Sequence, residues 1–209
     1  MLELSEIQAS WIPRLAGVDV LGDREFALRN LAPHHDRWIE DRFPEISTRH
    51  HAEQVHGNRI AVVTETSDQA ILQHAGVDGL MTNVPGQLLA IYVADCAAIY
   101  LVDSVTRAIA LLHSGKKGTE GNILREAVIQ MTELYGTRPS DLVGVVSPCI
   151  RPPDYEIDFA ATIRRQASEL GIAHFHDTCQ NTATDLAVHY SYRIEKGQTG
   201  RMLALLALV

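Results

Sequence analysis

The chain has few cysteines and no long apolar run. Its three cysteines (Cys96, Cys149 and Cys179) are odd in number and far apart, which argues against a disulfide framework. No apolar run reaches the ~20 residues that a membrane-spanning helix requires. The first residues, MLELSEIQASW, lack the basic, apolar and small-residue order of a secretory signal. We therefore expect a cytoplasmic protein, with Cys149 and Cys179 as buried structural thiols.

An excess of positive charge is also missing. Lys and Arg number 18 against 26 Asp and Glu, which gives a formal net charge of -8. Proteins that bind nucleic acid or a membrane surface display clustered basic residues, so we expect neither partner. A small anionic substrate stays compatible, because a local basic pocket can lie within an acidic protein.

Linkers and internal repeats are absent as well. No Gly-, Ser- or Pro-rich tract separates one part of the chain from another. The 209 residues suit one domain, and we expect a single domain over residues 1–209. The sequence does not fix the oligomeric state, for which a homodimer is one option.

Apolar patterning predicts a mixture of strands and helices. Near-continuous apolar runs indicate strands that are buried on both faces, and apolar residues at three-and-four spacing indicate helices. Charge-rich residues 23–49 predict an exposed helix plus loops, and His34-His35 and His50-His51 are interpreted as surface residues. The predicted strands are 59–64, 88–93, 98–102, 108–112, 142–147 and 202–209, and the predicted helices are 119–135 and 158–170. Since strands and helices do not alternate strictly, the fold class is α+β.

The stretch ALLHSGKKGTEGNIL (110–124) looks at first like a nucleotide phosphate loop. The Walker A pattern fails, because Ala110 stands where its first glycine belongs and Lys117 follows Lys116. A weaker anion site stays open, formed by Gly115, Gly118, both lysines and the helix N-terminus. The alternative is a strand-to-helix turn with two solvated lysines.

Two histidines and a cysteine end three of the apolar segments. His56, Cys96 and His113 each lie where one sheet edge could bring them together, and two imidazoles with one thiolate form a catalytic zinc set. Their separations match no short metal motif. Taken singly, Cys96 is better interpreted as a buried free thiol with Asp95 bonded to local backbone N–H groups, and His56 as a hydrogen-bonded structural histidine.

Four motifs together resemble one known family. They are QVHG (54–57), TNVPGQLLAIYVADC (82–96), HSGKKG (113–118) and SYRIEKGQTGRM (191–202). In this order they are similar to the YfiH-like proteins, also called laccase-domain or polyphenol-oxidase-like proteins, which are regarded as purine nucleoside phosphorylases. The resemblance runs from about residue 50 to the C-terminus. It implies stacked β-sheets in a sandwich with helices on the outer faces.

The resemblance also implies an activity and its residues. By motif match, His56, Cys96 and His113 bind zinc. The activity implied is zinc-dependent phosphorolysis of adenosine, inosine and methylthioadenosine, with adenosine deamination as a second activity. Lys116 and Lys117 are then candidates to hold phosphate, with Gly115 and Gly118 allowing close approach and Arg14 as a second cation. Asp95 is either a proton donor to the base or a partner that orients a ligand.

The chain departs from the family pattern near the expected substrate pocket. HAGWRG has become HSGKKG, which keeps positive charge but loses the planar fork of an arginine. The family's G-P-x-I-G appears as Ser147-Pro148-Cys149-Ile150-Arg151, without either glycine. These changes concern the choice of substrate more than metal binding.

Three other functions stay open. Copper-dependent phenol oxidation requires several His-x-His pairs, and the chain has one, His174-Phe175-His176, so zinc is expected rather than copper. A degenerate member would bind a nucleoside without turnover. A cysteine hydrolase would use Cys96 with a histidine as its base.

Overall fold

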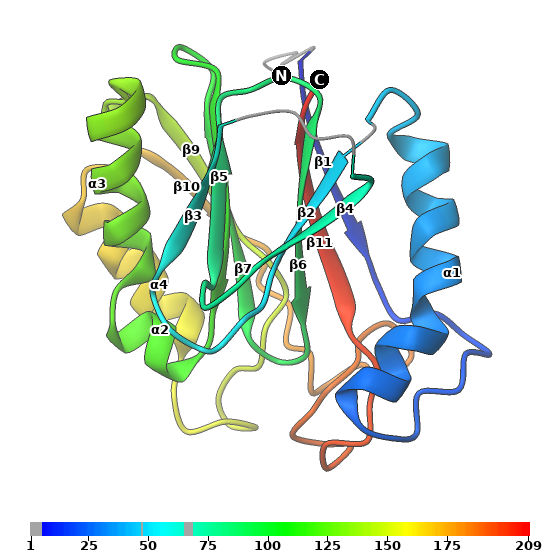
Figure 1. Ribbon diagram of the computed structural model, residues 1–209. Coiled ribbons are helices and arrows are strands. Elements are labelled where there is room, and N and C mark those ends of the chain that lie inside the picture. The colour runs from blue at the N-terminus through cyan, green and yellow to red at the C-terminus, as the bar shows by residue number, and fades with distance from the viewer. Residues whose placement is uncertain (1–5, 47, 65–68) are drawn as a thin grey trace.

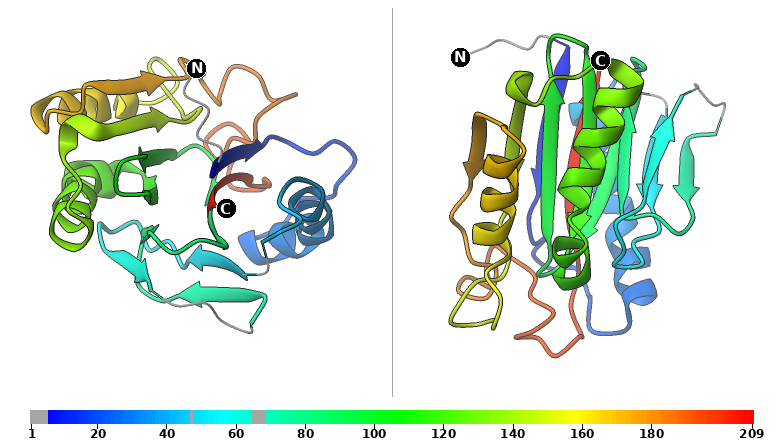
Figure 2. Two further views of the ribbon diagram at one scale, coloured as in Figure 1. Left: turned by 90° about the horizontal axis from the view of Figure 1, so that it is seen from above. Right: turned by 90° about the vertical axis from the view of Figure 1, so that its left-hand side faces the viewer.

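Two β-sheets stack face to face and helices cover their outer faces (Figure 1). The computed structural model describes residues 6–46, 48–64 and 69–209. Figure 2 shows the layers from above, with one long helix on one side and the shorter helices on the other. The predicted α+β sandwich is thereby confirmed.

Within the described residues, one sheet has five strands in the order β1-β11-β6-β2-β4. Its antiparallel half consists of β1, β11 and β6, whereas β6, β2 and β4 run parallel. The bounds are β1 Ile7–Ile12, β2 Thr48–Ala52, β4 Ile71–His74, β6 Gln87–Val93 and β11 Met202–Leu208. We call this sheet A.

Sheet B has six strands in the part of the chain that the structure describes, in the order β10-β9-β7-β8-β5-β3. The bounds are β3 Ile60–Val63, β5 Gly79–Thr82, β7 Ala97–Asp103, β8 Ala108–Ser114, β9 Leu142–Val146 and β10 His174–Asp177. The chain passes from sheet A to sheet B three times in a short connection, after β2, after β4 and after β6. These connections meet at one end of the sandwich, the lower end in Figure 1.

The helices divide between the two sheets. Helix α1 (Arg24–Arg42) covers sheet A, while α2 (Lys116–Glu120), α3 (Ile123–Tyr135) and α4 (Phe159–Glu169) cover sheet B. A 3-10 turn, η1 (Pro139–Asp141), precedes β9. None of the described helices combines the length and apolarity needed to cross a membrane.

Three apolar layers explain why several strands are apolar throughout. One layer lies between α1 and sheet A, the second between the two sheets, and the third between sheet B and the remaining helices. Strands β8 and β11 are buried at every position, because each has a covered layer on both faces. The runs that predicted doubly buried strands therefore mark the centre of the sandwich.

The structure corrects three expectations. The helix predicted over 119–135 is two helices, because Asn122 adopts a left-handed conformation (φ 51°, ψ 57°) and caps α3 by accepting a hydrogen bond from the Arg125 N–H at 3.0 Å. His35 and His50 are buried rather than on the surface, because His35 lies on the buried face of α1 and His50 lies in β2, hydrogen-bonded to Gln87 of the neighbouring strand β6 at 2.7 Å. Cys149 is buried as expected, but Cys179 is exposed in the loop after β10.

Candidate metal centre and substrate pocket

Three side chains from separate segments meet where the two sheets are connected. His56 lies in the loop between β2 and β3, Cys96 in the turn between β6 and β7, and His113 near the end of β8. One ligand atom from each lies within 4.8 Å of the others. The two imidazole rings meet edge to face, with centroids 5.0 Å apart. Among the described residues, no other group of three His, Cys, Asp or Glu side chains comes this close together.

Asp78 holds the loop that carries His56. Its carboxylate accepts hydrogen bonds from the backbone N–H groups of Val55 (3.2 Å), His56 (2.9 Å) and Gly57 (2.6 Å). His56 itself has a left-handed backbone with φ 62°, a conformation that costs free energy in a residue other than glycine. The three bonds to one buried acid offset that cost, and they fix the position of the imidazole.

The glutamine of the same QVHG motif anchors the loop to sheet A. The Gln54 side chain donates to the carbonyl oxygen of Tyr92 at 2.5 Å and accepts from the Tyr92 N–H at 3.0 Å. Gln54 thus pairs with the end of β6 as a neighbouring strand would. Gln54, the first residue of the motif, therefore has a structural role, whereas His56, the third residue, presents the candidate metal ligand.

Asp78 also orients His113. Its Oδ1 atom lies 2.8 Å from His113 Nδ1, and both side chains are buried. A carboxylate on one ring nitrogen leaves the other nitrogen free to ligate a metal. Asp78 is not among the residues that the sequence predicts for the site; its one signal is the position of an acid directly before the fully buried β5.

The charges in the cluster suit a metal. Burial raises the pKa of the Cys96 thiol, but hydrogen-bond contacts with His113 and His56 outweigh burial and bring the pKa down to about 6. Burial lowers the pKa of His113, yet Asp78 and Cys96 raise it to about 9. Burial raises the pKa of Asp78, and hydrogen bonds from His113 and from the Gly57 and His56 N–H groups lower it overall. The cluster therefore favours a Cys96 thiolate beside a protonated His113. A metal ion that displaced the His113 proton would meet one thiolate and two imidazoles, which is a donor set that zinc prefers.

The glycines of HSGKKG allow close packing around these ligands. A Cβ atom on Gly115 would lie 2.6 Å from Cys96 Sγ, and one on Gly118 would lie 3.0 Å from the carbonyl oxygen of Gly57. Both contacts are too short for an ordinary side chain. The two glycines therefore let α2 begin directly against Cys96 and the QVHG loop.

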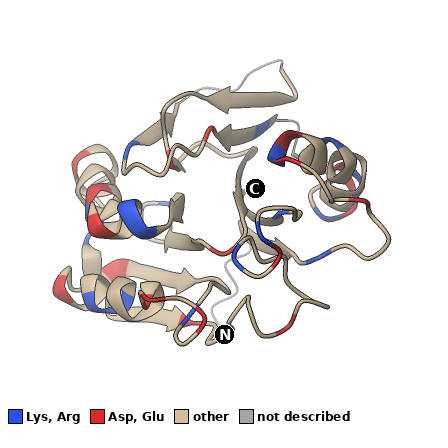
Figure 3. Ribbon diagram, turned by 90° about the horizontal axis from the view of Figure 1, so that it is seen from below, with Lys and Arg blue, Asp and Glu red and all other residues tan. Residues whose placement is uncertain are grey.

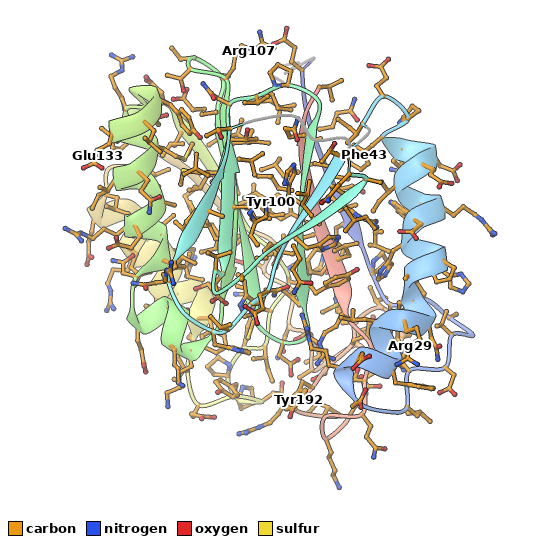
Figure 4. The ribbon with its side chains drawn as sticks, viewed as in Figure 1. Arg29, Phe43, Tyr100, Arg107, Glu133 and Tyr192 are labelled. Atoms are coloured by element: carbon orange, nitrogen blue, oxygen red, sulfur yellow. The ribbon has the colours of Figure 1, made fainter. Side chains whose placement is uncertain are left out.

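A cavity of about 650 Å³ opens over the cluster. Figure 3, seen from below, shows basic positions on the loops around this end and on α1. Figure 4 shows Tyr192 at the same end of the molecule. The cavity is lined by the three cluster residues, by four aromatic side chains (Tyr92, Tyr155, Phe159 and Tyr192), by five cations (Arg24, Lys116, Arg193, Lys196 and Arg201), and by Gln54, Ala94, Asp95 and Ile150.

Asp95 lies in the cavity with both of its oxygens engaged. Oδ1 accepts from the Thr182 hydroxyl at 2.8 Å, and Oδ2 accepts from the Arg193 N–H at 2.7 Å. These bonds join the β6–β7 turn to two C-terminal loops. The arrangement suits a carboxylate that orients its neighbours.

The predicted phosphate residues separate in the structure. Lys116 lines the cavity, whereas Lys117 is exposed and does not, because successive helical residues point about 100° apart. Arg14 does not line the cavity either: its guanidinium pairs with Glu195 at 2.9 Å and lies 4.7 Å from the centre of the Tyr190 ring. Of the three cations predicted to bind phosphate, Lys116 alone borders the cavity.

Comparisons with known proteins agree with this architecture. Residues 35–160 and 155–209 match the model of a family described as "multi-copper polyphenol oxidoreductase laccase". A protein of Geobacillus stearothermophilus named purine nucleoside phosphorylase YlmD is 28% identical over 225 residues, which cover 90% of this chain and 78% of that protein. A purine nucleoside phosphorylase of Deinococcus radiodurans is 37% identical over 155 residues, covering 63% of this chain and 61% of its own length.

A solved structure shares the fold. The crystal structure of YlmD from Geobacillus stearothermophilus superposes with a TM-score of 0.81 and 23% identity, and the match covers 100% of this chain and 94% of that one. At this identity the likeness shows the arrangement of strands and helices.

Proposed function

The chain belongs to the family described as multi-copper polyphenol oxidoreductase laccase, and within that family we propose that it is a zinc-dependent purine nucleoside phosphorylase. Its substrates are adenosine, inosine or methylthioadenosine together with inorganic phosphate, and adenosine deamination is a second activity. The observation that carries the proposal is the compact cluster of His56, Cys96 and His113 beneath an aromatic and cationic cavity. The names of the two matched relatives support the same activity.

His56, Cys96 and His113 would hold the metal. The low pKa of the Cys96 thiol supplies a thiolate near neutral pH, and Asp78 keeps the His113 ring in one orientation. When bound there, zinc would supply Lewis acidity and a water of lowered pKa, about 7, which is the chemistry that deamination at purine C6 requires. His174 and His176, the one His-x-His pair, lie in β10 and do not line the cavity, so zinc is favoured over a multicopper arrangement.

The remaining residues bind and orient the substrate. Tyr155 and Phe159 line the cavity with their ring centroids 5.2 Å apart, and aromatic rings in such a site can pack against a purine. The ammonium group of Lys116 borders the cavity and offers positive charge to phosphate or to a departing purine anion. Since both oxygens of Asp95 already accept hydrogen bonds, we assign it the role of positioning Arg193 and Thr182.

The test measures metal and products together. The purified protein is analysed for zinc and supplied with adenosine with and without phosphate, while adenine, hypoxanthine and ribose-1-phosphate are followed. We expect close to one zinc per chain and base release that depends on phosphate. Cys96→Ser should lose both, whereas Cys179→Ser, a change at an exposed cysteine, should lose neither. A protein that stays metal-free and inert after zinc addition would contradict the proposal.

One observation favours a second candidate, a cysteine hydrolase. Cys96, His113 and Asp78 form a hydrogen-bonded series of thiol, imidazole and carboxylate, which is the arrangement of a nucleophilic triad. The two functions differ in their response to a chelator. Metal removal abolishes phosphorolysis, whereas a hydrolase of this type keeps its activity without metal and loses it when Cys96 is alkylated.

A further inference from the structure

The cavity carries more positive charge than its surroundings neutralise. The chain as a whole has a net charge of -8, yet five cations line this one cavity and Asp95 is its only acid. Arg193 pairs with Glu156 at 3.2 Å. Within the described residues, the other four lining cations (Arg24, Lys116, Lys196 and Arg201) have no carboxylate partner. Uncompensated cations in a concave site attract and concentrate an anionic ligand.

Arg201 is the most firmly held of these cations. Its Nη1 atom donates to the carbonyl oxygens of Thr199 (3.0 Å) and Gly200 (2.8 Å), and its guanidinium carbon lies 5.8 Å from the centre of the Tyr192 ring. Nε and Nη2 have no hydrogen-bond acceptor among the described residues. Two donors of a rigid, planar group are thus left for a ligand at the cavity.

Arg24 brings a second guanidinium to the same side. It is the first residue of α1, directly after the capping residue Asp23, and, unlike that of Arg201, its side chain has no hydrogen bond or ion pair with a described residue. Burial lowers the pKa of Arg201, and the charge of Arg24 lowers it further. Each of two like charges facing one cavity raises the free energy of the other until an anion lies between them.

Paired guanidinium groups recognise one ligand chemistry especially well. Their parallel N–H donors match the oxygens of a phosphate, and they bind it with two bonds each where a lysine acts as a point charge. The turn at Lys116 and Lys117 offers no such fork, and Lys117 does not border the cavity.

We propose that Arg24 and Arg201 together bind a phosphate dianion in the cavity that opens over the His56–Cys96–His113 cluster. The dianion is either inorganic phosphate or the phosphate of a nucleoside ester, and the first case rests on the proposed phosphorylase function. The site joins the start of α1 to the start of β11, so it is assembled from the two ends of the chain.

The experiment measures binding directly, on the zinc-loaded full chain, with inorganic phosphate in one arm and adenosine 5′-monophosphate in the other. Arg24→Gln and Arg201→Gln should each weaken binding of the preferred probe at least tenfold. Arg29→Gln is the matched control, because Arg29 is an exposed residue of α1 (Figure 4) that pairs with Glu25 instead of lining the cavity. The affinity of this control variant for the probe should stay within twofold of the wild-type value. Arg201→Lys keeps the charge but should weaken binding as well, because it lacks the fork.

Each outcome has a defined meaning. Arg24 is exposed, so Arg24→Gln tests the site even if Arg201→Gln fails to fold. If the arginine variants bind phosphate at least tenfold more weakly, but the wild type releases no base, the result would support the phosphate site and contradict the proposed phosphorylase function. Phosphate-dependent base release with unchanged phosphate affinity in Arg24→Gln and Arg201→Lys would overturn the site and leave that function standing. Failure of the wild type to bind either probe would also overturn the site.

Discussion

At the scale of single residues, the geometry of the site depends most on Asp78. Its carboxylate accepts four hydrogen bonds, three from the backbone of the QVHG loop and one from the His113 ring. All four require an acceptor. The side-chain amide of an asparagine at this position would point its own N–H group at some of these donors and leave them without an acceptor. Each buried donor left unpaired lowers the free energy of unfolding by ~1–3 kcal/mol.

We therefore expect Asp78→Asn to weaken zinc binding by about 10- to 100-fold, the usual effect of losing a carboxylate behind a histidine ligand. A competition titration against a chelator of known affinity measures the change. Asp103→Asn is the matched control: Asp103 is equally buried in sheet B but caps the turn after β7 through Val105 and Thr106. It should lower stability and leave zinc affinity unchanged. Zinc affinity of Asp78→Asn equal to that of the wild type would contradict the assigned role.

The sequence reveals only some of the residues that the structure brings to the cavity. His56, Cys96 and His113 could be grouped because each follows or ends an apolar segment and the motifs around them are distinctive. Arg24 and Arg201 could not, because their proximity depends on how α1 packs beside β11, which no local pattern encodes. Lys117 looked equivalent to Lys116 in the sequence, and the direction of α2 separates them.

At the scale of elements, the contact between α1 and sheet A contains neutral histidines. His35 is fully buried, and neither ring nitrogen has a hydrogen-bond partner among the described residues. The His51 ring stacks on Tyr92 with centroids 5.3 Å apart, and within the same residues its Nδ1 atom also lacks a hydrogen-bond partner. Burial lowers the pKa of His35 to about 4, and nearby Arg49 adds to the effect; burial and Arg49 lower the pKa of His51 to about 3.

These histidines should make the packing of α1 sensitive to acid. Both stay neutral in the folded chain, whereas in the unfolded chain they gain protons below about pH 6.5. The unfolded state then binds more protons, so the free energy of unfolding is highest above pH 6.5 and falls as the pH drops toward 4, by up to ~1.4 kcal/mol per pH unit for each histidine. Urea unfolding of the metal-free chain between pH 7 and pH 5 measures this slope.

The control replaces the titrating groups. His35→Phe and His51→Phe keep an aromatic ring but cannot take up a proton, so each should flatten the slope relative to the wild type, whatever its effect on stability at pH 7. The difference between wild type and variant cancels the titration of all other groups. Identical slopes in the wild type and both variants would show that these rings do not control acid stability.

The elements that the sequence predicted are those that are apolar throughout. Strands β6, β7, β8 and β11 were predicted because covered layers on both faces require continuous apolar runs, and the shorter apolar runs of β3 and β9 were predicted as strands as well. Strands β2 and β4 were not, because their sequences (TRHHA and ILQH) are too polar and too short to signal a strand. Pairing with β6 holds β2 in place, and β4 pairs with β2 in turn. The break between α2 and α3 was missed because it depends on the backbone of one asparagine.

At the scale of the whole molecule, the candidate metal centre links the two sheets. His56 and Cys96 lie in two of the three short connections that lead from sheet A to sheet B, and His113 belongs to sheet B itself. An ion held by all three would restrain both connections at once. Metal binding should therefore stabilise the entire sandwich, and we propose that residues 1–209 unfold as a single domain.

Zinc should accordingly raise the melting temperature of the whole chain in one cooperative transition. A ligand that binds only the folded state stabilises it by about 2.7 kcal/mol when its free concentration is 100 times its dissociation constant. Calorimetry of the chelator-treated protein, with and without added zinc, measures the shift. His56→Ala should melt at the same temperature under both conditions, because it removes a ligand, whereas Cys179→Ser should keep the full shift. Two separate transitions, or a shift that persists in His56→Ala, would show that the metal does not join the sheets through this cluster.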